Sequence, residues 1–176
     1  MVYQNYSDAD NGSFLATLIA GRNYGLNVSK NGYLFYSANF SLVGHLEKDP
    51  YYVTAELSPI EVGNKVVLNN IFFDTNRFDI KPDSRAELQK LIDFLTKNPT
   101  VRIEISGHTD NVGNMQANQV LSQNRAKSVY EYLVNHGVNP ARLVYKGYGQ
   151  TQPIMPNTSD NNRSKNRRTE FKIIAK

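Results

Sequence analysis

The spacing of hydrophobic residues changes repeatedly between residues 66 and 176, and this change restricts the fold more than any other feature of the sequence. Residues 101–105 are apolar at every second position, which is the period of a strand with one buried face. Residues 88–95 instead place leucine and isoleucine at i, i+3, i+4 and i+7, the spacing of an amphipathic helix. Because strand and helix patterns alternate, this part of the chain is predicted to form an α/β domain.

Further patterns complete the predicted order of elements. A strand is expected over residues 66–73, and a helix is expected to begin near Ser84, which stands three residues before Glu87 as in a capping box. A second helix is predicted to open at Leu121-Ser122 and to end before Gly137. The remaining predicted segments are a strand over 142–146, a polar loop over 147–164 and a strand over 169–175. The prediction is a βαβαββ sandwich, with helices packed on a mixed sheet.

The first 60 residues resemble a small antiparallel β unit. Residues 24–28 alternate between apolar and small or polar side chains, and Asn31-Gly32 is a strong hairpin signal because both residues tolerate positive φ. Further strand material is expected at 14–19, 33–36 and 51–55. Ser58-Pro59 and Gly63-Asn64 then interrupt the pattern. We therefore expect a truncated β-sandwich-like module at residues 1–60 and the α/β domain at residues 61–176.

Charge and composition exclude several classes of function. The net charge of +4 divides into −2 over residues 1–65 and +6 over residues 66–176, which suggests two units with different partners. The basic residues are scattered except near Arg163–Arg168, so the sequence argues against nucleic acid as a partner. The chain has no cysteine, which excludes disulfides and thiolate zinc sites. No apolar run is long enough for a transmembrane helix, and the N-terminus does not resemble a signal peptide.

One polar segment follows directly on the strand over residues 101–105. This segment, 107–114, contains Asp110, and Arg125 lies fifteen residues further on inside the second predicted helix. A carboxylate binds an ammonium group, and the planar fork of an arginine binds a carboxylate, so the two could hold a zwitterion between them. The alternative is that Asp110 caps a turn while Arg125 pairs with a neighbouring acid. The residues by themselves leave both readings open.

Five motifs occur in order along the C-terminal part of the chain. They are Asn70–Asn76, Ile105–Gly113, Asn118 with Leu121–Ala126, Gly147-Tyr148-Gly149 and Asn166-Arg167-Arg168. With these motifs, residues 66–176 resemble the OmpA-like peptidoglycan-binding domain shared by OmpA-type proteins, Pal lipoproteins and MotB proteins. The resemblance implies non-covalent, non-catalytic binding of peptidoglycan through meso-diaminopimelate, with no cofactor and no metal.

The resemblance also implies which residues contact the ligand. Asp110 and Arg125 match the two residues of the family that bind diaminopimelate. Supporting contacts are implied for Phe73, Asp74, Thr75, Asn118, Leu121 and Arg168, the last preferred over Arg167. Arg168 could equally be a solvated charge that anchors the last strand. The chain departs from the family at Asn162-Arg163-Ser164 and at Thr169, which affects the expected geometry of the loop in the 150s.

Residues 12–57 resemble, less completely, a regulatory-type carboxypeptidase β-sandwich, which often precedes OmpA-like domains in Bacteroidetes envelope proteins. Such a module carries no catalytic zinc ligands and is expected to act as a spacer or interaction module. Together the resemblances imply a location on the periplasmic side of the outer membrane, with the export signal and anchor upstream of this sequence. Whether the chain forms a homodimer is left open.

Three other kinds of site are less well supported by the sequence. A metal site would need His108 and Asp110 with His45 or His136, but no metal-binding spacing links them. Nucleophilic catalysis lacks a Gly-x-Ser-x-Gly elbow, and the tyrosines fit half-buried strands better than a stacking platform for single strands. Three function classes therefore stand in order: a cell-wall binder, a structural module that acts through protein partners, and a cell-wall hydrolase.

Overall fold

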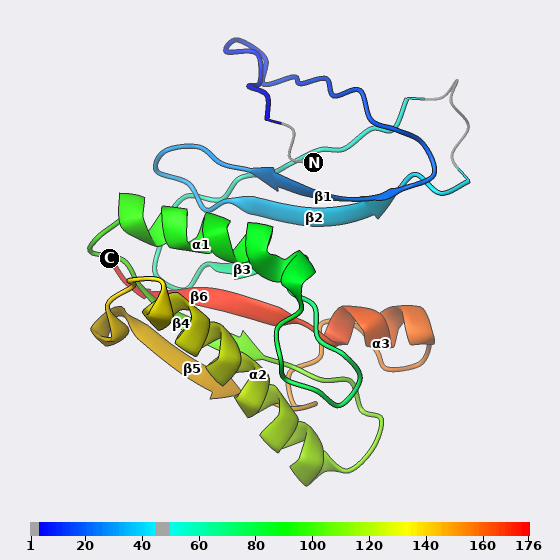
Figure 1. Ribbon diagram of the computed structural model, residues 1–176, viewed down its shortest axis with the longest axis vertical. Helices are drawn as coiled ribbons and strands as arrows, with labels where there is room; N and C mark the ends of the chain where they lie inside the picture. Colours follow the sequence, from blue (N-terminus) through cyan, green and yellow to red (C-terminus); the bar gives the residue numbers. More distant parts are fainter. Residues whose placement is uncertain (1–3, 45–49) are drawn as a thin grey trace. The chain divides into compact units, whose positions relative to one another are not determined.

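The structure, a computed structural model, describes residues 4–44 and 50–176 (Figure 1). The chain divides into two compact units, of which the first comprises Met1–Tyr24 and Phe40–Val53 and the second comprises Gly25–Asn39 and Thr54–Lys176. The boundary predicted between residues 60 and 61 stays a prediction. Each unit is described by itself.

The N-terminal residues contain fewer strands than their composition suggests. β1 (Asn23–Val28) and β2 (Tyr36–Ser41) pair as a two-stranded sheet, which confirms the strand expected over 24–28. The strands expected at 14–19 and 51–55 were wrong, and the one expected at 33–36 reaches β2 only through Tyr36. Leu15 and Ile19 are 78% and 57% exposed, so the apolar run over 14–19 has no buried face to hold it in a sheet. The Asn31-Gly32 turn needs positive φ only at Gly32 (+81°).

The second unit contains a four-stranded mixed sheet in the order β3-β6-β4-β5 (Figure 1). Its strands are β3 (Lys65–Val67), β4 (Arg102–Gly107), β5 (Leu143–Gly147) and β6 (Thr169–Ala175). β4 and β5 run parallel, whereas β6 lies antiparallel to both β4 and β3. The helices are α1 (Arg85–Lys97), α2 (Met115–Asn135) and the short α3 (Asp160–Asn166), with 3₁₀ turns at Pro82–Ser84 and Pro140–Arg142. The predicted α/β sandwich with helices on a mixed sheet is confirmed.

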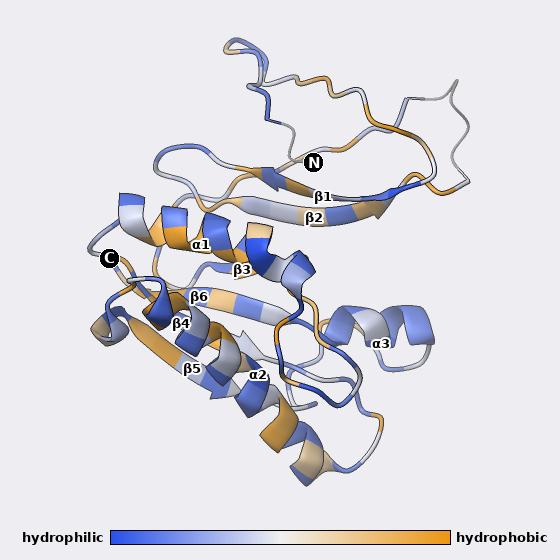
Figure 2. Ribbon diagram, in the orientation of Figure 1, coloured by the Kyte–Doolittle hydropathy of each residue, from blue (hydrophilic) through white to orange (hydrophobic). Residues whose placement is uncertain are grey.

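The core of this unit lies between the helices and the sheet. α1 presents its leucines inward, and the alternation of orange and blue along it in Figure 2 follows the predicted helical spacing. Residues upstream of the sheet also enter the core, because Leu34 and Phe35 are only 2% and 4% exposed. The ring of Phe35 lies 6.0 Å from Phe94 of α1 and 5.6 Å from Phe171 of β6. Segment 25–39 is therefore a structural part of the second unit.

Several predicted boundaries differ from the observed ones. β3 ends at Val67 rather than at residue 73, because the side chains of Asn69 and Asn70 turn to hydrogen-bond with Ser37 and its neighbour. α2 begins six residues before Leu121, where the side chain of Asn114 accepts a hydrogen bond from the Ala117 amide. α3 lies inside the predicted polar loop; it has no hydrophobic face, as its blue and white ribbon in Figure 2 shows.

The predicted capping box was wrong. Ser84 has a helical backbone, and its hydroxyl accepts a hydrogen bond from the amide of Phe72 at 2.8 Å instead of capping α1. Glu87 is fully buried, and its Oε2 accepts from the amide of Asn70 at 3.1 Å. The two side chains that resemble a local cap therefore hold the chain that leads out of β3.

Candidate functional site

Two glycines place α2 directly against the sheet. Gly107 and Gly147 are partners at the carboxyl ends of the parallel strands β4 and β5. A Cβ at residue 107 would lie 2.2 Å from the Ser122 carbonyl oxygen, and one at residue 147 would lie 2.3 Å from the Gln123 amide nitrogen. Only glycine permits this approach of backbone to backbone. The contact fixes the helix that carries Arg125 over the strand ends that lead to Asp110.

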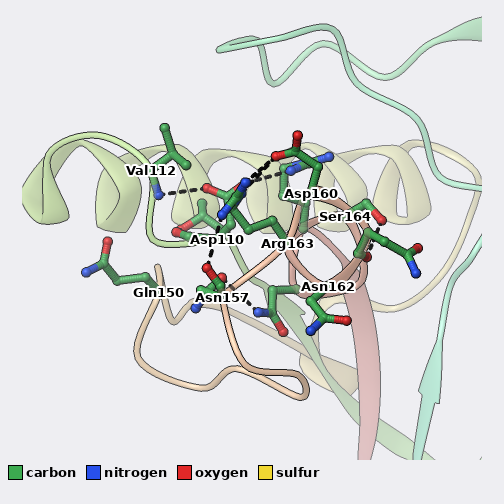
Figure 3. A network of polar contacts seen from close by, with 12 residues as sticks. Asp110, Val112, Gln150, Asn157, Asp160, Asn162, Arg163 and Ser164 are labelled. Carbon is green, nitrogen blue, oxygen red and sulfur yellow. Dashed lines mark hydrogen bonds and ion pairs between the residues drawn. The ribbon is translucent and has the colours of Figure 1, made fainter.

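Asp110 is held within a tight turn at the end of β4. Its Oδ1 accepts a hydrogen bond from the Val112 amide at 2.9 Å (Figure 3), and residue 110 is 7% exposed. The Asn118 amide donates to the carbonyls of Asp110 and Val112 and to the side chain of Gln150. Asn118, predicted to support the ligand, thus braces the loop that presents the carboxylate.

Arg125 is fixed by a second turn, which follows β3. Asn76 has a left-handed φ of 56°, which asparagine tolerates better than most residues, and the Arg77 amide donates to the Asp74 carbonyl across this turn. Arg125 Nε donates to the Arg77 carbonyl at 2.9 Å, and its Nη2 donates to the Asp74 carbonyl at 3.2 Å. The guanidinium carbon lies 5.0 Å from the centre of the Phe73 ring. Within the described residues, Nη1 of Arg125 has no hydrogen-bond partner.

A small pocket opens beside this guanidinium. Its lining consists of Ile71, Phe73, Arg125, Arg167, Arg168 and Thr169. Burial lowers the pKa of Arg125, the positive charge of Arg167 lowers it further, and the charge of Asp110 acts in the opposite direction. Arg125 is therefore partly desolvated, and within the described residues its guanidinium forms no ion pair with a carboxylate, which favours an anionic ligand.

The two consecutive arginines before β6 face different surroundings. Arg167 Nη1 forms an ion pair with Asp110 Oδ2 at 2.6 Å. Arg168 donates from Nε to Glu170 at 3.1 Å and from Nη2 to the Gln152 carbonyl at 3.2 Å, and its side chain is 5% exposed. The ion pair with Asp110 therefore belongs to Arg167, while Arg168, which was preferred as a ligand contact, lines the pocket and anchors β6.

The remaining predicted site residues lie near Arg125 in the structure or in the sequence, and their side chains differ in exposure. Phe73 is half-buried against Arg125, and Thr75 is exposed in the turn before Asn76. The Asp74 carboxylate pairs with Lys81 at 2.9 Å, while the backbone carbonyl of Asp74 accepts a hydrogen bond from Arg125. Leu121 is half-buried on α2, one turn before Arg125. The structure thus brings Phe73, Asp74 and Arg125 into direct contact, and it pairs Asp110 with Arg167 rather than with Arg125.

His108 is packed inside the domain behind the site. Its ring stacks on Tyr148 with centroids 5.3 Å apart, and Nε2 lies 3.3 Å from a Glu170 oxygen without the alignment of a hydrogen bond. Burial tends to raise the pKa of Glu170, but His108, Lys65 and Arg168 outweigh it and lower that pKa to about 2. Across residues 4–44 and 50–176, no three His, Asp or Glu side chains gather in a way that could hold a metal. His45, weighed as a metal ligand, lies outside the described residues.

The roles of Arg167 and Arg168 were readable in part from the sequence. Arg168 and Glu170 stand two positions apart beside a predicted strand, so their side chains share one face and carry opposite charges. That pattern favours an ion pair between Arg168 and Glu170. It places the side chain of Arg167 on the opposite face. The partner of Arg167 had no such signal, because Asp110 lies 57 residues away in the sequence.

Comparisons with known proteins show which family the chain resembles. Residues 72–167 match the model of the OmpA family. The outer membrane porin F of Pseudomonas fluorescens is 38% identical over 106 residues, which are 60% of this chain and 32% of that protein. The outer membrane protein Omp38 of Acinetobacter baumannii is 37% identical over 145 residues, which are 82% of this chain and 40% of that protein. The matched part of the chain thus spans between about a third and two fifths of the length of these relatives.

Solved structures show the same fold over a similar part of the chain. The periplasmic domain of Helicobacter pylori MotB (residues 97–256) superposes with a TM-score of 0.56 at 32% identity, over 68% of this chain and 88% of that one. The peptidoglycan-associated lipoprotein of Burkholderia pseudomallei superposes with a TM-score of 0.53 at 25% identity, over 60% of this chain and 88% of that one. Among the described residues, no helix combines the length and the apolar character needed to cross a membrane. The family match over more than half of the sequence and these structural likenesses lead to one conclusion: the chain belongs to the OmpA family.

Proposed function

We propose that this chain binds peptidoglycan without acting on it chemically, and that it grips the zwitterionic end of a diaminopimelate side chain between Asp110 and Arg125. The observation that carries the proposal is the state of the Arg125 guanidinium. Nε and one N–H of Nη2 are fixed on the carbonyls of Arg77 and Asp74, which leaves Nη1 and the second N–H of Nη2 for a ligand. Two such donors match the two oxygens of a carboxylate.

The amino group of the same ligand end would bind the carboxylate of Asp110. This carboxylate is oriented by the Val112 amide, so its direction is set before a ligand arrives. Each ion pair by itself is weak at a surface exposed to water. Both together require an ammonium and a carboxylate at a fixed spacing, which is the arrangement at an amino-acid end. The positive charge of Arg125 at the small pocket, which no carboxylate of the described residues pairs with, favours the ligand carboxylate further.

The relatives support the biological setting of this proposal. Several are outer membrane proteins by name, and one solved neighbour is a peptidoglycan-associated lipoprotein. We infer that the chain lies on the periplasmic side of the outer membrane and tethers that membrane to the cell wall. The alternative is a structural module of the envelope in which Asp110 and Arg125 only brace their loops. Its support is that Arg167 already pairs with Asp110.

Sedimentation with purified peptidoglycan separates the function classes. Binding without release of soluble muropeptides supports the proposal, and absence of binding supports the structural alternative. Soluble fragments in the supernatant would instead point to a hydrolase.

Substitution of either gripping residue tests the mechanism. Asp110→Ala or Arg125→Ala should weaken peptidoglycan binding by roughly 2 to 5 kcal/mol, because one charge of the ligand is left unpaired. Asp160→Ala and Lys127→Ala are matched controls, since both side chains are exposed (95% and 50%) and pair with other partners. Thermal unfolding of each variant verifies that the fold is intact. Binding that stays unchanged in both test variants would refute the grip.

A titration with small ligands tests the identity of the bound end. Diaminopimelate should bind more tightly than a lysine whose α-amino and α-carboxyl groups are both blocked, because the remaining side-chain end carries an ammonium without the carboxylate that Arg125 needs. Isothermal titration calorimetry measures both affinities under the same conditions. Equal affinities would contradict the role given to Arg125.

A further inference from the structure

Arg167 occupies the position that the amino group of the ligand needs. Its guanidinium lies at 2.6 Å from Asp110 Oδ2, while the other oxygen of Asp110 accepts from the Val112 amide. Both carboxylate oxygens are therefore engaged in the free protein. Each oxygen keeps a second lone pair, but the Asp110 side chain is only 10% exposed, so an amine that approaches it competes with Arg167 for the little surface that is left. The Val112 amide, by contrast, is part of the turn itself.

The contact of Arg167 is the more easily replaced of the two. Its side chain is 47% exposed, whereas that of Asp110 is 10% exposed. Within the part of the chain that the structure describes, the Asp110 carboxylate is the one hydrogen-bond partner of the Arg167 guanidinium. Arg168, by comparison, is held by Glu170 and by the Asn166 and Gln152 carbonyls. Arg167 can therefore leave Asp110 without breaking another hydrogen bond of its guanidinium within the described residues.

Arg167 also borders the small pocket beside Arg125. Both arginines line the small pocket with Ile71 and Phe73. Their positive charges oppose each other there, as the lowered pKa of Arg125 reflects after the larger effect of burial. A carboxylate bound at Arg125 would turn this repulsion into attraction for both guanidinium groups.

We propose that Arg167 is an internal competitor that makes the site selective for zwitterions. In the free protein it neutralises Asp110; on binding, the ammonium of the ligand replaces it, and Arg167 moves to share the ligand carboxylate with Arg125. The pair between Arg167 and Asp110 is then exchanged for a pair of the ligand ammonium with Asp110 and for a ligand carboxylate shared by Arg125 and Arg167. This exchange is complete only if the ligand carries both charges. A simple amine breaks the pair between Arg167 and Asp110 and gives Arg167 no new partner, so it is rejected. This inference rests on the proposed function.

The test compares two probes that share the spacing of their amino groups. Diaminopimelate carries a carboxylate beside each amine, and 1,5-diaminopentane carries none. In Arg167→Gln, 1,5-diaminopentane should bind about tenfold more tightly than in the wild type, because its competitor for Asp110 is gone. Diaminopimelate should bind more weakly, because one carboxylate partner is lost. The preference for diaminopimelate should fall at least tenfold.

Two further variants separate this role from a structural one. Arg163→Gln removes the same charge from the neighbouring helix, where Arg163 pairs with Asp160 (Figure 3), and it should leave the preference unchanged. Arg167→Lys keeps a cation beside Asp110 but loses the planar fork, so 1,5-diaminopentane should stay weak while diaminopimelate loses affinity. Circular dichroism checks the fold of each variant, and the lysine variant remains informative if the glutamine variant does not fold.

The outcomes distinguish this inference from the proposed function. If Arg167→Gln weakens both probes equally, or changes neither, Arg167 is a brace and the inference is overturned. If the wild type binds neither diaminopimelate nor peptidoglycan, the proposed function fails. The comparison of 1,5-diaminopentane between wild type and Arg167→Gln still measures competition for Asp110 in that case, because it needs no carboxylate site.

Discussion

The two helices that cover the sheet are held to it in different ways. α2 rests on β4 and β5 through backbone contacts at Gly107 and Gly147, where no side chain fits. The region around α1 is joined to its surroundings through side chains: Phe35 packs on Phe94, Ser84 bonds to Phe72, and Glu87 bonds to Asn70. The glycines that α2 contacts lie within recognisable sequence motifs. The side-chain contacts of the α1 region depend on partner residues that no local sequence pattern indicates.

The largest effect is expected where an upstream side chain fills the core of the α1 region. Phe35→Ala should lower the free energy of unfolding by about 3 to 5 kcal/mol, because it leaves a cavity between Phe94 and Phe171. Phe78→Ala is the matched control; Phe78 is 45% exposed and should cost less than about 1 kcal/mol. Urea unfolding measures the free energy of unfolding of both variants. A loss at residue 35 as small as that at residue 78 would show that segment 25–39 is not part of this core.

The backbone contact under α2 should tolerate no added atom. Gly107→Ala should cost about 3 kcal/mol and shift α2, since the new Cβ meets a backbone oxygen that cannot rotate away. Gly137→Ala serves as control because residue 137 has a φ of +90° and open space around it, so it reports backbone strain of about 1 kcal/mol without a clash. Thermal unfolding with diaminopimelate titration measures stability and site together. Equal losses in the two variants would argue that conformation, not close packing, fixes α2.

A smaller effect is expected from the hydroxyl that holds the chain after β3. Ser84→Ala should cost about 1 to 3 kcal/mol, because the Phe72 amide loses its acceptor. Ser128→Ala, whose hydroxyl only donates to Asn124 within the same helix, should be nearly neutral. Hydrogen exchange at the Phe72 amide reports directly on its hydrogen bond to the Ser84 hydroxyl. If the protection of that amide is unchanged, the Ser84 hydroxyl does not hold the chain at Phe72.

The smallest effect is a change with pH. Burial raises the pKa of Glu87, although hydrogen bonds from Ser37, Asn70 and Asn27 oppose it. A carboxyl group with a raised pKa in the folded state contributes stability that is fully present below its ordinary pKa and is lost as the pH rises through the folded value. The free energy of unfolding should therefore fall with pH in the mildly acidic range, and Glu87→Gln should remove this slope. The same slope in both proteins would exclude Glu87 as its source.

The contrast between the two regions also explains what the sequence could predict. The alternating elements, the strand over 169–175 and the glycine after α2 follow from local spacing, and they were confirmed. Ser84 and Glu87 were misread as a local cap because their partners lie 12 and 17 residues away and have no periodic signature. Likewise Asp110 and Arg125 could be chosen as candidates from their motifs, but the pairing of Asp110 with Arg167 depends on a tertiary contact. Local patterns define elements, and long-range polar contacts decide how the site is set before a ligand binds.

The antiparallel pairing of β3 with β6 has a mechanical consequence. Val67 lies opposite Glu170, near the end of β6 that carries Arg167, and Lys65 lies opposite Lys172, further from the site. If a ligand is held at the site while tension acts on the chain that enters β3, the pull runs along the strand axes. The hydrogen bonds between β3 and β6 then bear the load together in shear, rather than one after another as in unzipping. A short edge strand of three residues can in this way transmit force to a bound ligand without peeling off the sheet.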